Sequence, residues 1–228
     1  MRPSALDIWA VIPVKETPHA KRRLWPSVPA YLREQLVLTM LEDVLMVVSR
    51  VPGLAGIALV TLDAKASSLG QSYGARILTE DARDGHTPAV AAAARRLAAE
   101  GVGGMMQLPG DIPLVTAQEI SLVVSMHRAA PSFTIVPSHD DRGSNTIVVS
   151  PPNAVPLTFG DDSFLPHLRT ARRCGIEPLV LRQPGIARDV DNAEDLDAFA
   201  RVRSATRTQA FLDGNSFADW LRIADARV

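Results

Sequence analysis

Segments typical of β-strands and segments typical of α-helices alternate along almost the whole chain, and this alternation limits the fold more than any other feature. An apolar, β-branched run at 8–14 precedes a helical pattern at 31–51, and the same succession recurs further on. Such alternation is typical of a parallel or mixed sheet covered by helices. Further strands are expected at 56–63, 75–80, 104–108, 133–138, 146–152 and 176–182, and further helices at 64–74, 88–100, 162–174 and 193–204. Another helix is expected from Thr116, which is typical of an N-cap with Glu119 three residues later.

The length of 228 residues is enough for one α/β domain with a single large core. We expect this domain to span residues 1–204. The amphipathic tail at 205–228 is expected to pack on the domain or on a second subunit, and in the second case the protein would be a homodimer. The strands at 133–138 and 146–152 are expected to form an antiparallel pair across the polar residues between them.

The composition argues against several classes of protein. With 46% hydrophobic residues and a net charge of -1, the chain does not resemble a nucleic-acid binder that relies on overall charge. Cys174 is the single cysteine, which fits a reducing compartment. No apolar run reaches membrane-spanning length, and the N-terminus lacks a signal-peptide core. We therefore expect a cytoplasmic protein whose partners include neither nucleic acid nor membrane.

A basic stretch, PVKETPHAKRRL at 13–24, follows the first strand. Open α/β sheets bind ligands beyond the carboxyl ends of their strands, so this is a candidate binding loop. Its cations are Lys15, Lys21, Arg22 and Arg23, and fixed positive charge of this kind suits a polyphosphate. A solvated basic loop is the alternative. The sequence has no Walker-type phosphate loop, so a P-loop nucleotidase is not supported.

Acidic residues follow two of the predicted strands. Asp111 ends the strand at 104–108 in LPGDIPL, and a turn aspartate is the simple alternative. Asp189 and Asp191 lie in DVDNAEDL, where extended backbone would point both the same way. Placed near Asp111, they would form a site of hard oxygen ligands that suits Mg²⁺. Capping of the following helix by Asp191 and Asn192 is the alternative there.

Five stretches occur along the chain in this order: VIPVK…AKRRL, LPGDIPL, GSNTIVV, FGDDSFLPHL and DVDNAEDL. Together they resemble the guanylyltransferase family of deazaflavin-coenzyme biosynthesis. The resemblance implies a single-domain, mixed and mostly parallel sheet with a glycosyltransferase-A-like nucleotidyltransferase fold. It also implies transfer of GMP from GTP to 2-phospho-L-lactate, phosphoenolpyruvate or 3-phospho-D-glycerate, with release of pyrophosphate. An unstable product could then be handed to the next enzyme of the pathway.

The resemblance also assigns roles to residues. It implies that Lys15, Lys21 and Asp111 take part in catalysis, and that Asp111 and one acid of the later segment bind Mg²⁺. We favour Asp191 for this second ligand, because it directly precedes the start of the expected helix, and Asp189 is the alternative. It implies contacts between the phosphorylated acid and Thr146, Gly160 and Ser163. The implied nucleotide-binding residues are Pro13, Lys15, Lys21, Arg23, Glu80, Gly85 and Thr87.

The region of base recognition departs from the family pattern, which is often G-L-N-x-A. Here it reads Gly85-His86-Thr87-Pro88-Ala89, so the contacts to guanine stay open. Glu80 or Asp81 could accept hydrogen bonds from the base, and an exposed turn acid is the alternative.

The acid-binding stretch has a structural alternative as well. Gly160 permits close backbone approach, and Ser163 offers a hydroxyl near a helix start. A hairpin turn at Gly143 and a helix cap at residues 161–163 would account for the same residues without a ligand. His167, one turn after Ser163, could face the pocket or serve only in the structure.

Three other functions remain open from the sequence. One is a cytidylyltransferase of a pterin cofactor, and another is a nucleotide-sugar glycosyltransferase that uses Asp189-Val190-Asp191 as a D-x-D motif. The third is a binding module that has lost catalysis. GMP transfer itself needs no catalytic His or Ser, because the attacking phosphate, with a second pKa of ~6, is already ionised. Its main barrier is the approach of two anions, which cations can neutralise.

Overall fold

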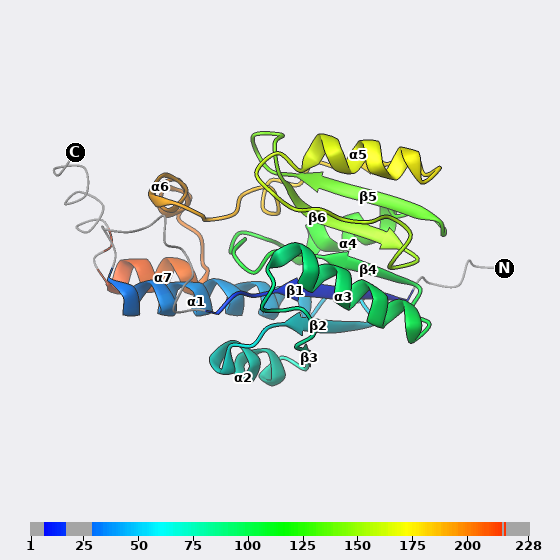
Figure 1. Ribbon diagram of the computed structural model, residues 1–228. Coiled ribbons are helices and arrows are strands. Elements are labelled where there is room, and N and C mark those ends of the chain that lie inside the picture. The colour runs from blue at the N-terminus through cyan, green and yellow to red at the C-terminus, as the bar shows by residue number, and fades with distance from the viewer. Residues whose placement is uncertain (1–6, 17–28, 216, 218–228) are drawn as a thin grey trace.

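One mixed sheet of seven strands forms the centre of the structure, a computed structural model in which residues 7–16, 29–215 and 217 are described (Figure 1). The strand order is β3-β2-β1-β4-β6-β5-β7, and β6 runs antiparallel to both of its neighbours. The other neighbouring pairs are parallel. The strands are β1 Ile8–Pro13, β2 Gly56–Val60, β3 Arg76–Leu78, β4 Gly104–Gln107, β5 Ser132–Pro137, β6 Ser144–Ser150 and β7 Leu179–Val180.

Helices cover both faces of the sheet, as the alternating sequence pattern predicts. Neighbouring residues of β1 point to opposite faces, so Ile12 packs with α1, α2 and α4 while Val11 packs with α3 and α5. The predicted α/β fold is therefore confirmed. The helices are α1 Ala30–Val48, α2 Ala64–Ser72, α3 His86–Ala99, α4 Ala117–Met126, α5 Phe164–Arg173, α6 Ala193–Arg201 and α7 Arg207–Gly214.

Local sequence signals set several helix ends. Thr116 caps α4 and forms a capping box with Glu119, as the sequence predicts. The predicted helix at 88–100 begins earlier, at His86, because Gly85 takes a φ of 109° before it, a conformation that glycine allows. The predicted strand at 176–182 is reduced to β7, which pairs with β5 at the edge of the sheet. Pro178, just before β7, has no N–H for the ladder.

The start of the predicted C-terminal tail packs on α1. Asp43 of α1, 1% exposed, accepts hydrogen bonds from the backbone N–H groups of Arg207 and Thr208, both at 2.9 Å. The Thr208 hydroxyl donates a third bond to it at 2.6 Å. Figure 1 shows α6 and α7 beside the first half of α1, where Leu212 joins a small apolar core. Residues 216 and 218–228 of this tail lie outside the described residues.

The strand directions bring six connections to one edge of the sheet. The strands β1, β2, β3, β4, β5 and β7 end at this edge, and β6 begins there. In the described residues, no helix is long and apolar enough to cross a membrane.

Candidate functional site

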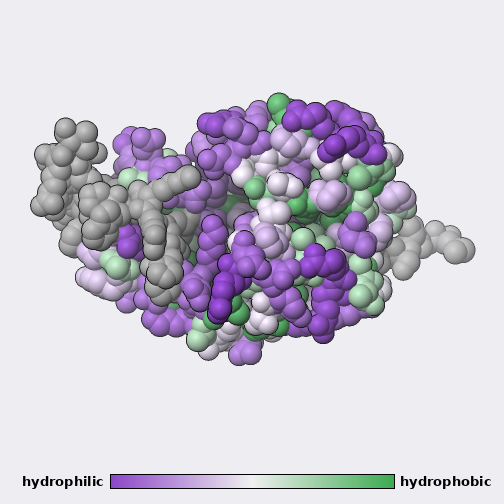
Figure 2. Space-filling model, in the orientation of Figure 1, coloured by the Kyte–Doolittle hydropathy of each residue, from purple (hydrophilic) through white to green (hydrophobic). Residues whose placement is uncertain are grey.

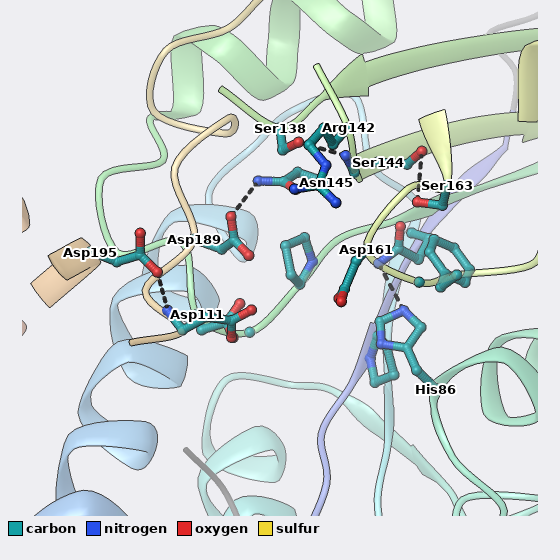
Figure 3. Close-up of a pocket in the computed structure, with 18 of the residues that line it drawn as sticks. His86, Asp111, Ser138, Arg142, Ser144, Asn145, Asp161, Ser163, Asp189 and Asp195 are labelled. Atoms are coloured by element: carbon teal, nitrogen blue, oxygen red, sulfur yellow. Dashed lines mark hydrogen bonds between the residues drawn. The ribbon is translucent and has the colours of Figure 1, made fainter. Parts of the chain in front are cut away.

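A cleft of about 760 Å³ lies at the carboxyl edge of the sheet (Figure 3). This volume lies within the range of small-molecule and cofactor sites, ~300–1,000 Å³. In the space-filling view, hydrophilic residues border a recess beside α6 (Figure 2). The charged and polar lining residues are Lys15, His86, Gln107, Asp111, Ser138, His139, Asp140, Arg142, Ser144, Asn145, Asp161, Ser163, Asp189, Asp191, Asn192 and Asp195.

The structure brings more than half of the sequence-predicted residues together in this cleft. Lys21 and Arg23 lie outside the described residues. Glu80, Gly85, Thr87 and Thr146 are described but do not line the cleft. The predicted residues that line it are Pro13, Lys15, Asp111, Gly160, Ser163, Asp189 and Asp191.

Two acid-bearing segments meet through a backbone hydrogen bond. The N–H of Val190 donates to the carbonyl oxygen of Asp111 at 3.0 Å, so the turn after β4 lies against the loop before α6. Burial raises the pKa of Asp189 to about 6, and the charges of Asp111 and Asp191 add to this effect. The Asn145 amide opposes it by donating a hydrogen bond to Asp189 Oδ1 at 3.1 Å. The acids therefore repel one another at neutral pH.

Capping of α6 does not account for Asp189 and Asp191. The cap is Asn192, whose side chain accepts from the N–H of Asp195 at 3.0 Å. Asp195 accepts in return from the N–H groups of Asn192 and Asp191, at 3.1 and 3.0 Å. The capping alternative thus holds for Asn192 and is wrong for Asp191.

The acids fit a cation that also has water or phosphate ligands. Among the described residues, no group of three or more His, Cys, Asp or Glu side chains is placed to hold a metal ion by itself. Mg²⁺ usually binds one or two carboxylates and completes its shell with waters and substrate phosphates. Burial and the charges of Asp111 and Asp191 raise the pKa of Asp189, and a bound cation would offset this effect.

Lys15 lies just beyond β1 and lines the same cleft as the acids. Its side chain is exposed, and the preceding Val14 is tied to β2 by a bond from its N–H to Val60 O at 2.9 Å. The charges of Lys15 and Asp111 both affect the pKa of His86. Burial lowers this pKa to about 4, the charge of Asp111 opposes the shift, and the charge of Lys15 adds to it. A cation and a carboxylate therefore stand on the same stretch of the cleft.

Sequence reasoning missed a group of side chains at the cleft's floor. Gln107, the last residue of β4, has its Nε2 3.4 Å from His86 Nε2. Its Oε1 is buried and has no hydrogen-bond partner among the described residues. The His86 ring packs on Phe159, with 4.4 Å between centroids. A lone polar residue in an otherwise apolar strand was the signal that could have identified Gln107.

Glu80 and Asp81, the acids predicted to accept hydrogen bonds from guanine, form ion pairs and do not line the cleft. Glu80 pairs with Arg96 at 3.2 Å, and Asp81 pairs with Arg95 at 2.8 Å, on the exposed surface of α3. Thr87 has a structural contact, since its hydroxyl accepts from the N–H of Phe159 at 2.9 Å. This bond ties the start of α3 to the segment before α5.

Ser163 and Gly160 lie at the opposite end of the cleft. Ser163 precedes α5, but its side chain makes no capping hydrogen bond. It donates instead to the Ser144 hydroxyl at 3.3 Å, so the capping alternative is wrong for its side chain. A Cβ on Gly160 would meet no protein atom within 4 Å, which leaves space for a ligand. Thr146 is fully buried in β6, and its hydroxyl has no partner among the described residues.

Known proteins resemble this chain in sequence. The family described as "Guanylyl transferase CofC like" matches residues 8–218. A phosphoenolpyruvate guanylyltransferase of Roseiflexus castenholzii is 31% identical over 204 residues, covering 90% of this chain and 93% of that protein. A 3-phospho-D-glycerate guanylyltransferase of Colwellia psychrerythraea is 31% identical over 194 residues, covering 85% and 91%.

Solved structures share the fold. A protein of Desulfovibrio desulfuricans G20, provisionally assigned as a nucleotide-diphospho-sugar transferase, has a TM-score of 0.73 at 19% identity, covering 95% of this chain and 97% of that one. The CMP:2-keto-3-deoxy-manno-octonic acid synthetase complexed with CTP has a TM-score of 0.56 at 12% identity, covering 86% and 98%. The predicted glycosyltransferase-A-like nucleotidyltransferase fold is thereby confirmed.

Proposed function

The chain belongs to the CofC-like guanylyl transferases, and on this premise we propose that it transfers GMP from GTP to a small phosphorylated three-carbon acid. The candidate acids are phosphoenolpyruvate, 3-phospho-D-glycerate and 2-phospho-L-lactate. The first two are the substrates for which relatives are named. We place the reaction in the biosynthesis of a deazaflavin coenzyme.

The observation that carries this proposal is the division of one cleft into two chemically distinct ends. Lys15 and the carboxylates of Asp111, Asp189 and Asp191 lie at one end, which suits a triphosphate and its counter-cation. Hydroxyls and the open space at Gly160 lie at the other end, which suits a small anion. A cleft of about 760 Å³ has room for both substrates side by side.

The chemistry is a displacement at the α-phosphorus of GTP. A phosphate oxygen of the acid attacks this phosphorus, the bond to the bridging oxygen of the β-phosphate breaks, and pyrophosphate leaves. The acid's phosphate is already ionised near pH 7, so no side chain has to remove a proton. The protein's work is to align two anions and offset their repulsion.

The residues divide this work between them. Lys15 would neutralise the leaving phosphates, with Lys21 and Arg23 as further predicted cations on the same basic stretch. Asp111 and Asp191, with Asp189 beside them, would hold Mg²⁺, and a bound Mg²⁺ would neutralise phosphate charge between the substrates. Ser163 and Gly160 would receive the acid.

Two rivals from the sequence make different products. A glycosyltransferase would release a nucleoside diphosphate, and its D-x-D motif would be Asp189-Val190-Asp191, which does line the cleft at both acids. A cytidylyltransferase would release pyrophosphate from CTP in place of GTP. The third rival, a module without catalysis, is set aside, because the chain matches guanylyltransferases over most of its length.

The test is a matrix of four nucleoside triphosphates against the three acids, with Mg²⁺ present. Released pyrophosphate and the acid–GMP anhydride, identified by mass spectrometry, are measured together. Coupling to the next enzyme of the pathway traps a short-lived product. We expect pyrophosphate and anhydride in equal amounts from GTP with one of the acids. Release of GDP, or equal use of CTP, would contradict the proposal.

A further inference from the structure

Two hydrogen-bonded hydroxyls, of Ser144 and Ser163, lie at the end of the cleft that is proposed to bind the phosphorylated acid. Ser144 begins β6, Ser163 precedes α5, and Figure 3 shows both on the side of the cleft away from Asp111. Ser163 Oγ donates to Ser144 Oγ at 3.3 Å. Behind them lies His167, 2% exposed, with its Nδ1 2.9 Å from Ser144 Oγ.

The hydrogen bonds determine which nitrogen of His167 carries its proton. The backbone N–H of Thr158 points at His167 Nε2 at 3.0 Å, and a backbone N–H can only donate. Nε2 must therefore accept, so the neutral ring carries its proton on Nδ1 and donates it to Ser144. Burial lowers the pKa of His167 to about 4, which keeps the ring in this neutral form near pH 7.

The direction of these bonds leaves one proton unused. A serine hydroxyl has two accepting lone pairs and one proton to donate. Ser144 accepts from His167 and from Ser163, so both lone pairs are engaged. Its own O–H donates to no protein acceptor among the described residues, and Ser144 lines the cleft. The O–H is thus available to a bound ligand.

We infer that Ser144 donates a hydrogen bond to an anionic oxygen of the phosphorylated acid, and that His167 is a positioning residue that orients Ser144 for it. This inference rests on the proposed function, since it names how the same cleft holds its second substrate. A hydroxyl whose lone pairs are engaged can only donate, so it favours a carboxylate or phosphate oxygen over any donor group. Neither Ser144 nor the neutral His167 contributes a charge, so this contact leaves the attacking phosphate of the acid ionised.

The two amide replacements of His167 separate its two bonds. In His167→Asn the side-chain amide falls near the Nδ1 position, so it can still donate to Ser144 but loses the acceptor for Thr158. In His167→Gln the amide falls near the Nε2 position, so it keeps the acceptor for Thr158 and loses the donor to Ser144. His127→Gln is a matched control. His127 is also a buried histidine between two hydroxyls, Thr134 at 2.9 Å and Ser150 at 3.0 Å, but it lies outside the cleft.

The experiment measures binding of phosphoenolpyruvate, 3-phospho-D-glycerate and 2-phospho-L-lactate by calorimetry, together with the KM values for GTP and for the acid that is used. We expect Ser144→Ala to weaken binding of that acid ~10–100-fold, the usual effect of losing one hydrogen bond to an ion. The KM for GTP should not change. His167→Gln should resemble Ser144→Ala, His167→Asn should retain more of the acid affinity, and His127→Gln should leave it unchanged.

Failure of this inference and failure of the proposed function give different results. If the wild type turns over GTP with an acid and Ser144→Ala binds that acid equally well, the inference is wrong and the function stands. Equal weakening of GTP and acid would also overturn it, because it would show a general structural effect. If the wild type neither binds nor uses any of the three acids, the proposed function is wrong and the inference falls with it.

Discussion

The backbone N–H of Val190 donates a hydrogen bond to the carbonyl oxygen of Asp111 at 3.0 Å, joining the turn after β4 to the loop before α6. Because main-chain groups make this bond, the side chain of Asp111 is not needed to hold the two segments together. Val190 is 2% exposed, which anchors the loop, while its neighbours Asp189 and Asp191 line the cleft. Asp111 therefore lines the cleft beside Asp189 and Asp191, in the turn that follows β4.

Removal of the Lys15 charge should weaken the use of GTP. We expect Lys15→Ala to raise the KM for GTP ~10-fold, the lower end of the effect of losing one hydrogen bond to a charged group. The side chain is exposed, so thermal stability should not change. Lys65→Ala is the control, because Lys65 is exposed and pairs with Glu34 outside the cleft. Lys21→Ala is expected to resemble Lys15→Ala. Wild-type kinetics in both variants would show that the basic stretch is only a solvated surface.

Filling the space at Gly160 should affect the acid and not the fold. A Cβ there meets no protein atom within 4 Å, so Gly160→Ala has room in the free protein. We expect an unchanged melting temperature and a KM for the acid raised more than that for GTP, measured by steady-state kinetics. An unchanged KM for the acid would place the acid pocket elsewhere.

The raised pKa of Asp189 predicts a pH dependence of stability in the absence of metal. Its folded pKa of about 6 exceeds the unfolded value of ~3.9, so this carboxyl stabilises the fold in its protonated form. That contribution is fully present below ~pH 4 and is lost as pH rises through about 6. With EDTA present, urea unfolding should show the wild type losing ~1–2 kcal/mol relative to Asp189→Asn between pH 4 and pH 7.

Added Mg²⁺ should reverse this loss at pH 7 in the wild type more than in Asp189→Asn. Comparison of the two proteins cancels other groups that titrate in the same range. If the two stability curves stay parallel without metal, Asp189 does not carry the repulsion that the structure indicates.

The contact between α1 and α7 should contribute to stability and not to catalysis. Asp43→Ala removes three hydrogen bonds to the start of α7 and leaves buried donors unpaired. We expect a loss of ~2–3 kcal/mol in urea unfolding. Thr208→Val removes one of the three bonds and should cost less. Kinetic constants measured well below the melting temperature should stay at wild-type values, and a wild-type unfolding curve for Asp43→Ala would contradict this account.

Features with local signals could be predicted from the sequence. The alternation of segments predicts the α/β fold, and Thr116 with Glu119 predicts the start of α4, because a capping box involves only neighbouring residues. Asp111 was a candidate because an acid at the end of an apolar strand is unusual. Each of these signals lies within a few residues of the feature that it predicts.

Features that depend on distant partners could not be predicted in this way. Glu80 looked available to a base until the structure placed Arg96 of α3 beside it. His167 had two readings in the sequence, and only the approach of Thr158 and Ser144 shows how its ring is held. Gln107 stands out as a polar residue in an apolar strand, but its contact with His86, 21 residues away, depends on the fold.

The central claim is that Asp111 and its neighbours hold the cation on which GMP transfer depends. Its most direct test is to measure turnover by the wild type and by Asp111→Asn as a function of Mg²⁺ concentration. Asparagine keeps the size and the turn preference of aspartate but removes the charge. We predict a loss of turnover of ~10²–10³-fold, by analogy with removal of one preorganised contact to the transition state. A higher Mg²⁺ requirement and partial recovery with Mn²⁺ should accompany it, with stability unchanged or slightly higher. Identical curves with equal turnover would contradict the claim and leave Asp111 as a turn residue.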